Sequence, residues 1–145
     1  MSIRINKDPG SRSKEEFLTG VSMHIRDVQK GCAFIANKII EAGINHDYTK
    51  ISLADDFMDD LKLSGADFKN GKWFQAHISH ERHHFDKWPD KLNLIDVIEC
   101  LVDVVMAATA RKGDVGDILL SNELLQEAVK NTVEMLKDEI VLEHQ

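Results

Sequence analysis

Apolar residues recur every three or four positions over the first third of this chain, and this spacing limits what it can form. Between Ser13 and Ala42 the series consists of Phe17, Val21, Ile25, Val28, Cys32, Ile35 and Ile39. Residues at this interval share one face of an α-helix. Ser13 followed by Glu16 fits a capping box, and Gly43 fits a helix stop. The pattern predicts a long first helix over about residues 13–42.

The rest of the chain continues the helical pattern. Further helices are predicted from Ser52 past Leu61 and over about residues 72–85, 92–111 and 121–142. The connections are a loop over 64–71, a stop at Trp88-Pro89 and a turn over 112–117. No segment has the pattern of a strand. The prediction is an all-α fold, a single compact bundle of five or six helices over 14–145, preceded by a flexible lead-in over 1–13.

Composition excludes several classes of protein. The 145 residues include 18 Lys and Arg against 25 Asp and Glu, a net charge of −7, which disfavours non-specific nucleic-acid or membrane-surface binding. The longest apolar run, around residues 102–106, is too short to span a bilayer, and the first 13 residues lack the apolar core of a secretory signal. Cys32 and Cys100 stand alone, as buried thiols of a reducing compartment do. We expect a cytoplasmic protein.

Four of the seven histidines fall within eight residues, at 77, 80, 83 and 84. On a helix, His77, His80 and His84 would share one face, and His80 and His84, four apart, could offer two imidazoles to one metal ion. The alternative is a solvated polar face, a packed histidine or an adventitious metal patch. The spacing favours a metal site on this helix.

Other candidate ligands lie on neighbouring helices. His46-Asp47 stands at a helix junction, where Asp47 could instead cap the next helix. Asp96, Glu99 and Asp103 form one stripe on an apolar helix, and burial there would require a cation or a basic partner unless the stripe is solvated. His24 lies at the edge of the first helix, where a packed histidine is the commoner role. Nitrogen and oxygen donors without thiolate suit Mn, Fe, Co, Ni or Zn, as one ion or two.

The order His24, His46-Asp47, later histidines and a final aspartate resembles the HD-domain metal-dependent phosphohydrolase superfamily. A narrower resemblance, over about residues 20–111, is to a small uncharacterised HD-like family of bacteria and their phages. The shared motifs are His46-Asp47-Tyr48-Thr49-Lys50, the His-rich segment 77–88, and the acidic helix with Glu99 and Asp103. The resemblance favours Asp103 over Asp96 as the last ligand. It implies a helical HD-like fold with the metal ligands His24, His46, Asp47, His80, His84 and Asp103.

The resemblance also implies hydrolysis of a nucleotide or related phosphoester by metal-activated water. Lys50 stands where many HD nucleotidases have glutamate, so Glu81 or Glu99 is expected to take the acid–base role. Lys50 and Arg82 are expected to hold phosphate, and Trp73 to stack a base. The alternatives are a non-catalytic binding module, which Lys50 favours, and a diiron oxygenase. The apolar last helix is compatible with a homodimer.

Overall fold

Helices make up most of the structure, and two short parallel strands join the two ends of the chain. The computed structural model describes residues 2–7 and 10–143. The elements are β1 (Ile3–Asn6), α1 (Lys14–Asn45), α2 (Tyr48–Ser52), α3 (Ala54–Asp60), α4 (Gly65–Lys69), α5 (Lys72–His80), α6 (Leu94–Lys112), α7 (Asn122–Glu139) and β2 (Ile140–Glu143). The predicted all-α class is confirmed in its essentials, with the small sheet as an addition. None of the described helices is both long and apolar enough to cross a membrane.

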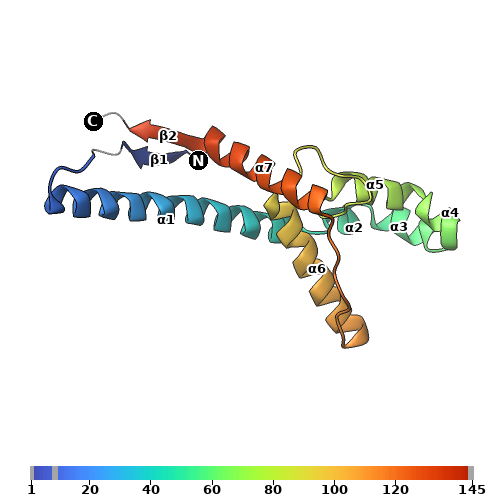
Figure 1. The fold of residues 1–145 in the computed structure, drawn as a ribbon. Coiled ribbons are helices and arrows are strands. Elements are labelled where there is room, and N and C mark those ends of the chain that lie inside the picture. The colour runs from blue at the N-terminus through green and yellow to red at the C-terminus, as the bar shows by residue number, and fades with distance from the viewer. Residues whose placement is uncertain (1, 8–9, 144–145) are drawn as a thin grey trace.

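The long helix α1 runs as a rod along the molecule (Figure 1). The Ser13 side chain accepts a hydrogen bond from the Glu16 backbone N–H at 3.2 Å, as the sequence predicts. The Glu16 carboxylate, however, accepts from the backbone N–H of Arg12 at 2.7 Å. The helix continues past Gly43 and ends at His46, after which Asp47 adopts a left-handed conformation with φ 56°. Asp47, rather than a glycine, therefore takes the left-handed conformation that follows this helix.

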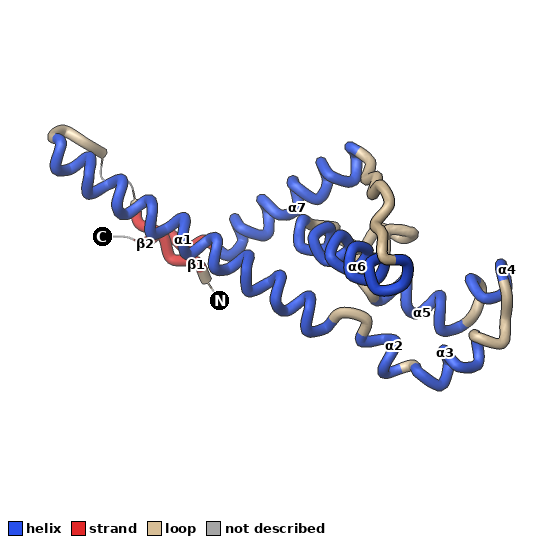
Figure 2. Tube along the Cα trace, turned by 90° about the horizontal axis from the view of Figure 1, so that it is seen from below, coloured by secondary structure: helices blue, strands red, loops and turns tan. Residues whose placement is uncertain are grey.

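The strands were not predicted. β1 pairs in parallel with β2, with Ile3 opposite Ile140, and the sheet lies beside α1 in both views (Figures 1 and 2). Ile3 is buried, and the Asn6 backbone N–H donates to Asp27 of α1 at 2.8 Å. The prediction of a flexible lead-in is wrong at residues 3–6, which form β1. The prediction of a last helix that reaches residue 142 is wrong at residues 140–142, which belong to β2. Two four-residue strands have no local signal strong enough to reveal a partner so distant in sequence. Residues 1 and 8–9 of the lead-in lie outside the described residues.

The core lies between the start of α6 and the middle of α7. Leu92, Val97, Leu124 and Ala128 are buried together there. Asn131 of α7 donates to the Leu92 carbonyl at 2.8 Å, and the Leu94 N–H donates to the Thr132 hydroxyl at 2.9 Å. These bonds satisfy backbone groups that the N-terminus of α6 would otherwise leave unpaired. They fix the position of α6, which carries two of the acidic side chains described below.

Helices α2 to α5 gather at the end of the molecule opposite the two strands (Figure 1). α4 lies within the predicted loop over 64–71. The buried Asp60 carboxylate accepts from the backbone N–H groups of Trp73 at 2.8 Å and Phe74 at 3.3 Å, and so caps α5. Gly71 is the residue directly before α5, and it lies so close to the Asp60 carboxylate that a Cβ there would overlap it. The absence of a side chain at Gly71 therefore allows Asp60 to cap the helix.

We expect Gly71→Ala to destabilise the protein by about 1–2 kcal/mol, because the methyl group would displace the Asp60 cap. At an unhindered site the same change commonly stabilises by roughly 0.4–1 kcal/mol. Gly116→Ala is the matched control, since a Cβ at Gly116 would meet nothing within 4 Å. Urea unfolding of both variants measures the difference. Equal stabilities for the two variants would contradict the role assigned to Gly71.

Candidate metal centre

Segments from four parts of the chain bring imidazoles and carboxylates together. His46 and Asp47 form the turn between α1 and α2, and His77 lies on α5. His83 and His84 lie in the turn that follows α5, and α6 contributes Glu99 and Asp103. Most of these side chains are buried or half-buried. Residues that are almost 60 positions apart therefore meet at one place in the structure.

Two overlapping sets of donor atoms could each hold a metal ion. In each set, one nitrogen or carboxylate oxygen per residue lies within 4.8 Å of the others. The first set is Asp47, His77, His83 and His84, and the second is His46, His83 and Asp103. His83 belongs to both sets and is only 2% exposed, so it stands at the centre of the cluster.

The ring of His77 is held by a chain of hydrogen bonds. The Thr49 hydroxyl donates to Glu81 Oε1 at 2.6 Å and lies 2.6 Å from His77 Nδ1. A hydroxyl has one hydrogen, so with Glu81 accepting it, the hydroxyl must accept from an Nδ1–H of His77. That tautomer leaves a lone pair on Nε2, which accepts a hydrogen bond from His84 Nε2 at 2.7 Å within the cluster. The Trp73 ring stacks on the imidazole at 4.7 Å and further fixes it.

One carboxylate orients two more imidazoles. Glu99 Oε1 lies 2.9 Å from His46 Nδ1, in a hydrogen bond. It also lies 3.0 Å from His83 Nδ1, at ion-pair distance although not aligned for a hydrogen bond. Metal-binding histidines characteristically present one ring nitrogen to the ion while a carboxylate or another acceptor holds the other. His46 and His77 follow this pattern, and His83 Nδ1 faces the Glu99 carboxylate without a hydrogen bond.

The inward-facing atoms converge on Asp47. Its Oδ1 lies 3.5 Å from His77 Nε2 and 3.7 Å from His83 Nε2. His46 Nε2 lies 3.4 Å from Asp47 Oδ2 and 3.3 Å from Asp103 Oδ1. Four buried side-chain atoms of the described residues lack a hydrogen-bond partner, and Asp47 Oδ1 and both ring nitrogens of His83 are three of them. Unpaired buried polar atoms are costly, and a cation between them would remove that cost.

The electrostatics of the cluster favour the neutral form of two imidazoles and the charged form of a third. Burial alone would lower the pKa of His46, but its hydrogen bond to Glu99 and the charges of Asp47 and Asp103 outweigh burial and raise it. Burial, together with the neighbouring His84, lowers the pKa of His77 to about 4, so His77 is neutral near pH 7. Burial also lowers the pKa of His84. Burial alone would raise the pKa of Glu99, but its contacts with His83 and His46 outweigh burial and lower it. Neutral imidazole and ionised carboxylate are the forms that bind metal.

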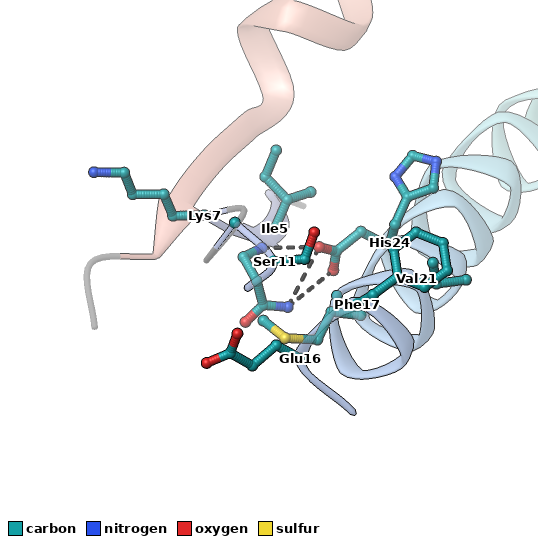
Figure 3. Close-up of a pocket in the computed structure, with 12 residues that line it drawn as sticks. Ile5, Lys7, Ser11, Glu16, Phe17, Val21 and His24 are labelled. Atoms are coloured by element: carbon teal, nitrogen blue, oxygen red, sulfur yellow. Dashed lines mark hydrogen bonds between the residues drawn. The ribbon is translucent and has the colours of Figure 1, made fainter. Parts of the chain in front are cut away.

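Two predicted ligands lie outside the cluster. His24 is exposed on α1 and lines a separate pocket of about 410 Å³ near β1, with Phe17 and Val21 (Figure 3). His80 is exposed, and its Nδ1 lies 2.7 Å from the Ala76 carbonyl in its own helix. The structure therefore places His77 and His83, rather than His24 and His80, beside the other predicted ligands. It brings His46, Asp47, His84 and Asp103 together as predicted.

The end of α5 explains why His83, rather than His80, joins the cluster. α5 ends at His80 and the backbone becomes extended at Glu81, so His80 and His84 do not share a helical face. Adjacent residues on a helix point about 100° apart, so His83 and His84 can reach one ion together only if the helix has ended. The adjacency of His83 and His84 was therefore the sequence signal that could have predicted the helix end. The role of Thr49 depends on tertiary contacts alone.

The residues predicted to bind substrate have structural partners. Arg82 donates to the two Asp96 carboxylate oxygens at 2.7 and 2.8 Å, so Asp96 is paired with a cation and completes the capping box of α6. Asp96 therefore does not compete with Asp103 for the cluster. Trp73 is 4% exposed and packs against Phe57 and His77, so its ring is not available to stack on a base. The sequence specifies neither the pairing of Arg82 with Asp96 nor the burial of Trp73.

The residues predicted to act in catalysis touch the cluster or its supports. Lys50 forms an ion pair with Asp47 Oδ2, and its side chain is 42% exposed. The Glu81 carboxylate accepts from the Thr49 backbone N–H at 2.8 Å and from the hydroxyl described above, so it holds α2 and His77 in place. Glu99 orients His46 and His83. In this structure Glu81 and Glu99 act as positioning residues.

Fold and site together define a mostly helical protein with a buried His/Asp cluster that could hold a metal ion. The donor set fits such an ion, since nitrogen and oxygen donors face inward and two of their atoms lack other partners. The chain belongs to the family described as "Family of unknown function (DUF5662)", whose model matches residues 13–141. No curated protein and no solved structure matches the chain.

Proposed function

We propose that this protein is a divalent-metal-dependent phosphohydrolase acting on a nucleotide or a related phosphoester. The observation that carries the proposal is the arrangement of His46, His77 and His83. Their Nε2 atoms face Asp47, and their Nδ1 atoms lie 2.6–3.0 Å from Glu99 or Thr49. The order of His46-Asp47 and Asp103 along the chain, which resembles the HD superfamily, supports the reaction class.

The ligands in this proposal are His46, Asp47, His77, His83, His84 and Asp103. Their nitrogen and oxygen atoms suit Mn, Fe, Co, Ni or Zn. When bound, such an ion supplies a water of lowered pKa and polarises a phosphoryl oxygen. Glu99 holds two of the imidazoles in the orientation that binding requires, and Thr49 with Glu81 holds the third. Preorganisation of this kind limits the rearrangement needed for binding.

A cavity beside the cluster has the size of a small-molecule site. It has a volume of about 820 Å³ and is lined by Thr49, Glu81 and Glu99, with Lys38 and Lys72 among its other residues. Both lysines form surface ion pairs, at 3.0 Å to Glu41 and Asp56, and such pairs rearrange at little cost. Lys38 also lies over the Phe34 ring, at 5.8 Å from its centroid. In the proposal these lysines, together with Lys50, bind the phosphate. Glu99 lies at the cavity wall and is the candidate for proton transfer.

The test is a hydrolysis assay of the full chain with Mn, Co, Ni, Zn or Fe(II) against a panel of nucleoside mono-, di- and triphosphates. Chromatography would detect the products. We expect hydrolysis that Asp103→Asn abolishes and that Asp114→Asn, a control at an exposed position, leaves unchanged. Stoichiometric metal without hydrolysis of any member of the panel would contradict the proposal.

A non-catalytic binding module is the second candidate, and the Lys50–Asp47 ion pair favours it. An ammonium group on Asp47 Oδ2 already neutralises part of the charge that a metal ion would neutralise. This candidate predicts no stoichiometric metal in protein prepared without a histidine tag. Elemental analysis of such protein separates the two candidates, and Lys50→Met should raise the metal content if the ammonium competes with the ion.

A further inference from the structure

The longest helix has no buried residue. α1 spans 32 residues, all of them described, and each keeps some accessible surface. Val21, Ile25 and Val28 are 37%, 51% and 49% exposed. Helices in proteins are stabilised mainly by burying an apolar face, and α1 leaves much of its own uncovered. A surface absent from the single chain must therefore cover it.

Two apolar grooves run along α1 and meet at Ile39. The first, of about 630 Å³, extends toward the sheet and is lined by Val28, Cys32, Ile35, Ile39, Leu136 and Ile140, among others. The second, of about 320 Å³, extends toward α6 and includes Ile39, Ile98, Val102 and Met106. Val105 and Met106 of α6 are 41% and 67% exposed. Together they form one continuous apolar surface, called here the α1–α6 surface.

The total accessible area measures how much surface is uncovered. The chain exposes 10532 Å² for a mass of 16.4 kDa. A compact monomer of this mass would expose about 7,500 Å². The excess, about 3,000 Å², is larger than the roughly 1,000–2,500 Å² that each subunit commonly buries in an obligate homodimer. The uncovered area is thus sufficient for a permanent interface.

We propose that the α1–α6 surface is the interface of a homodimer, so that a second copy of this chain covers α1. Part of the uncovered area belongs to α1, the longest helix, so its covering surface must be present whenever the chain is folded. A second copy is always present at the same concentration, and a two-fold interface needs only one self-complementary surface. The second groove is also lined by His46, Glu99 and Asp103, which places the second copy beside the candidate metal centre.

The first measurement is the mass of the full chain in solution, by light scattering or sedimentation at micromolar concentration. We expect twice 16.4 kDa. The midpoint of thermal unfolding should also rise with chain concentration, because dissociation and unfolding are linked in such a dimer. A mass of one chain, or of more than two, would overturn the proposal.

Variants locate the interface. Val28→Glu places a charge in the first groove, and Gln29→Glu adds the same charge at the next, exposed position of α1. We expect Val28→Glu to halve the mass and Gln29→Glu to leave it unchanged, since burying an unpaired carboxylate opposes association. Met106→Glu repeats the test on α6 if Val28→Glu does not fold. A dimer that survives both substitutions would overturn the assignment of this surface.

Discussion

We expect His83→Ala to remove stoichiometric metal from the protein. His83 belongs to both candidate ligand sets. It is almost fully buried, so solvent is not placed to supply a substitute ligand when the imidazole is removed. Loss of a residue that merely orients a ligand commonly weakens metal binding by about 10–100-fold. Loss of a shared ligand should exceed about 100-fold. Elemental analysis of tag-free protein and competition with a chelator measure the change.

The controls for this prediction are His80→Ala and His24→Ala. Both side chains are exposed and lie outside the cluster, so we expect metal content to match that of the unmodified protein. Thr49→Val removes the hydroxyl that holds His77 and should weaken binding by about 10–100-fold. Metal retained by His83→Ala and lost by His80→Ala would show that the helical pair His80/His84, rather than the turn, supplies the ligands.

Thermal unfolding gives a second measure of the same effect. Bound metal stabilises the folded state by about 2.7 kcal/mol when its free concentration is 100 times the dissociation constant. In the unmodified protein a chelator should therefore lower the unfolding midpoint by several degrees. His83→Ala should show no such dependence. A chelator-sensitive midpoint in His83→Ala would contradict the assignment of this ligand.

Arg82→Met is expected to destabilise the protein by about 2–3 kcal/mol. The Asp96 side chain is 4% exposed, and Arg82 donates to both of its oxygens and to the Asp90 and Lys91 carbonyls at 3.1 and 3.3 Å. Breaking a buried pair by removing one partner typically costs about 3–5 kcal/mol. The Arg82 side chain is 44% exposed, so the effect should be smaller here. Denaturant unfolding at neutral pH measures it.

The matched control is Lys62→Met. Lys62 and Asp59 form a pair whose side chains are both about three-quarters exposed, and we expect at most a small change in stability. At denaturant concentrations at which the Arg82→Met variant stays folded, it should keep the metal content of the unmodified protein. If Arg82 instead binds phosphate, its loss would weaken substrate binding without changing stability. Those two results separate a structural role from the substrate-binding role predicted from the sequence.

The sequence predicted the helices better than it predicted their ends. Apolar spacing located α1, α6 and α7 to within a few residues, because a long amphipathic face repeats the same signal at every turn. It missed the parallel pairing of Ile3–Asn6 with Ile140–Glu143, where four residues carry little local pattern. It also extended α5 to Phe85, whereas contacts between Glu81 and Thr49 accompany an end at His80.

The same division holds for the candidate site. The residues alone singled out the histidine-rich segment, since histidines are uncommon at such density, and the resemblance to the HD superfamily pointed to His46-Asp47 and Asp103. Only the tertiary structure chose His77 and His83 over His24 and His80 and paired Arg82 with Asp96. Sequence spacing describes which side chains share a face of one helix. The cluster depends on a helix end, a left-handed turn at Asp47 and the contact of α1 with α6, and these arise when distant segments pack together.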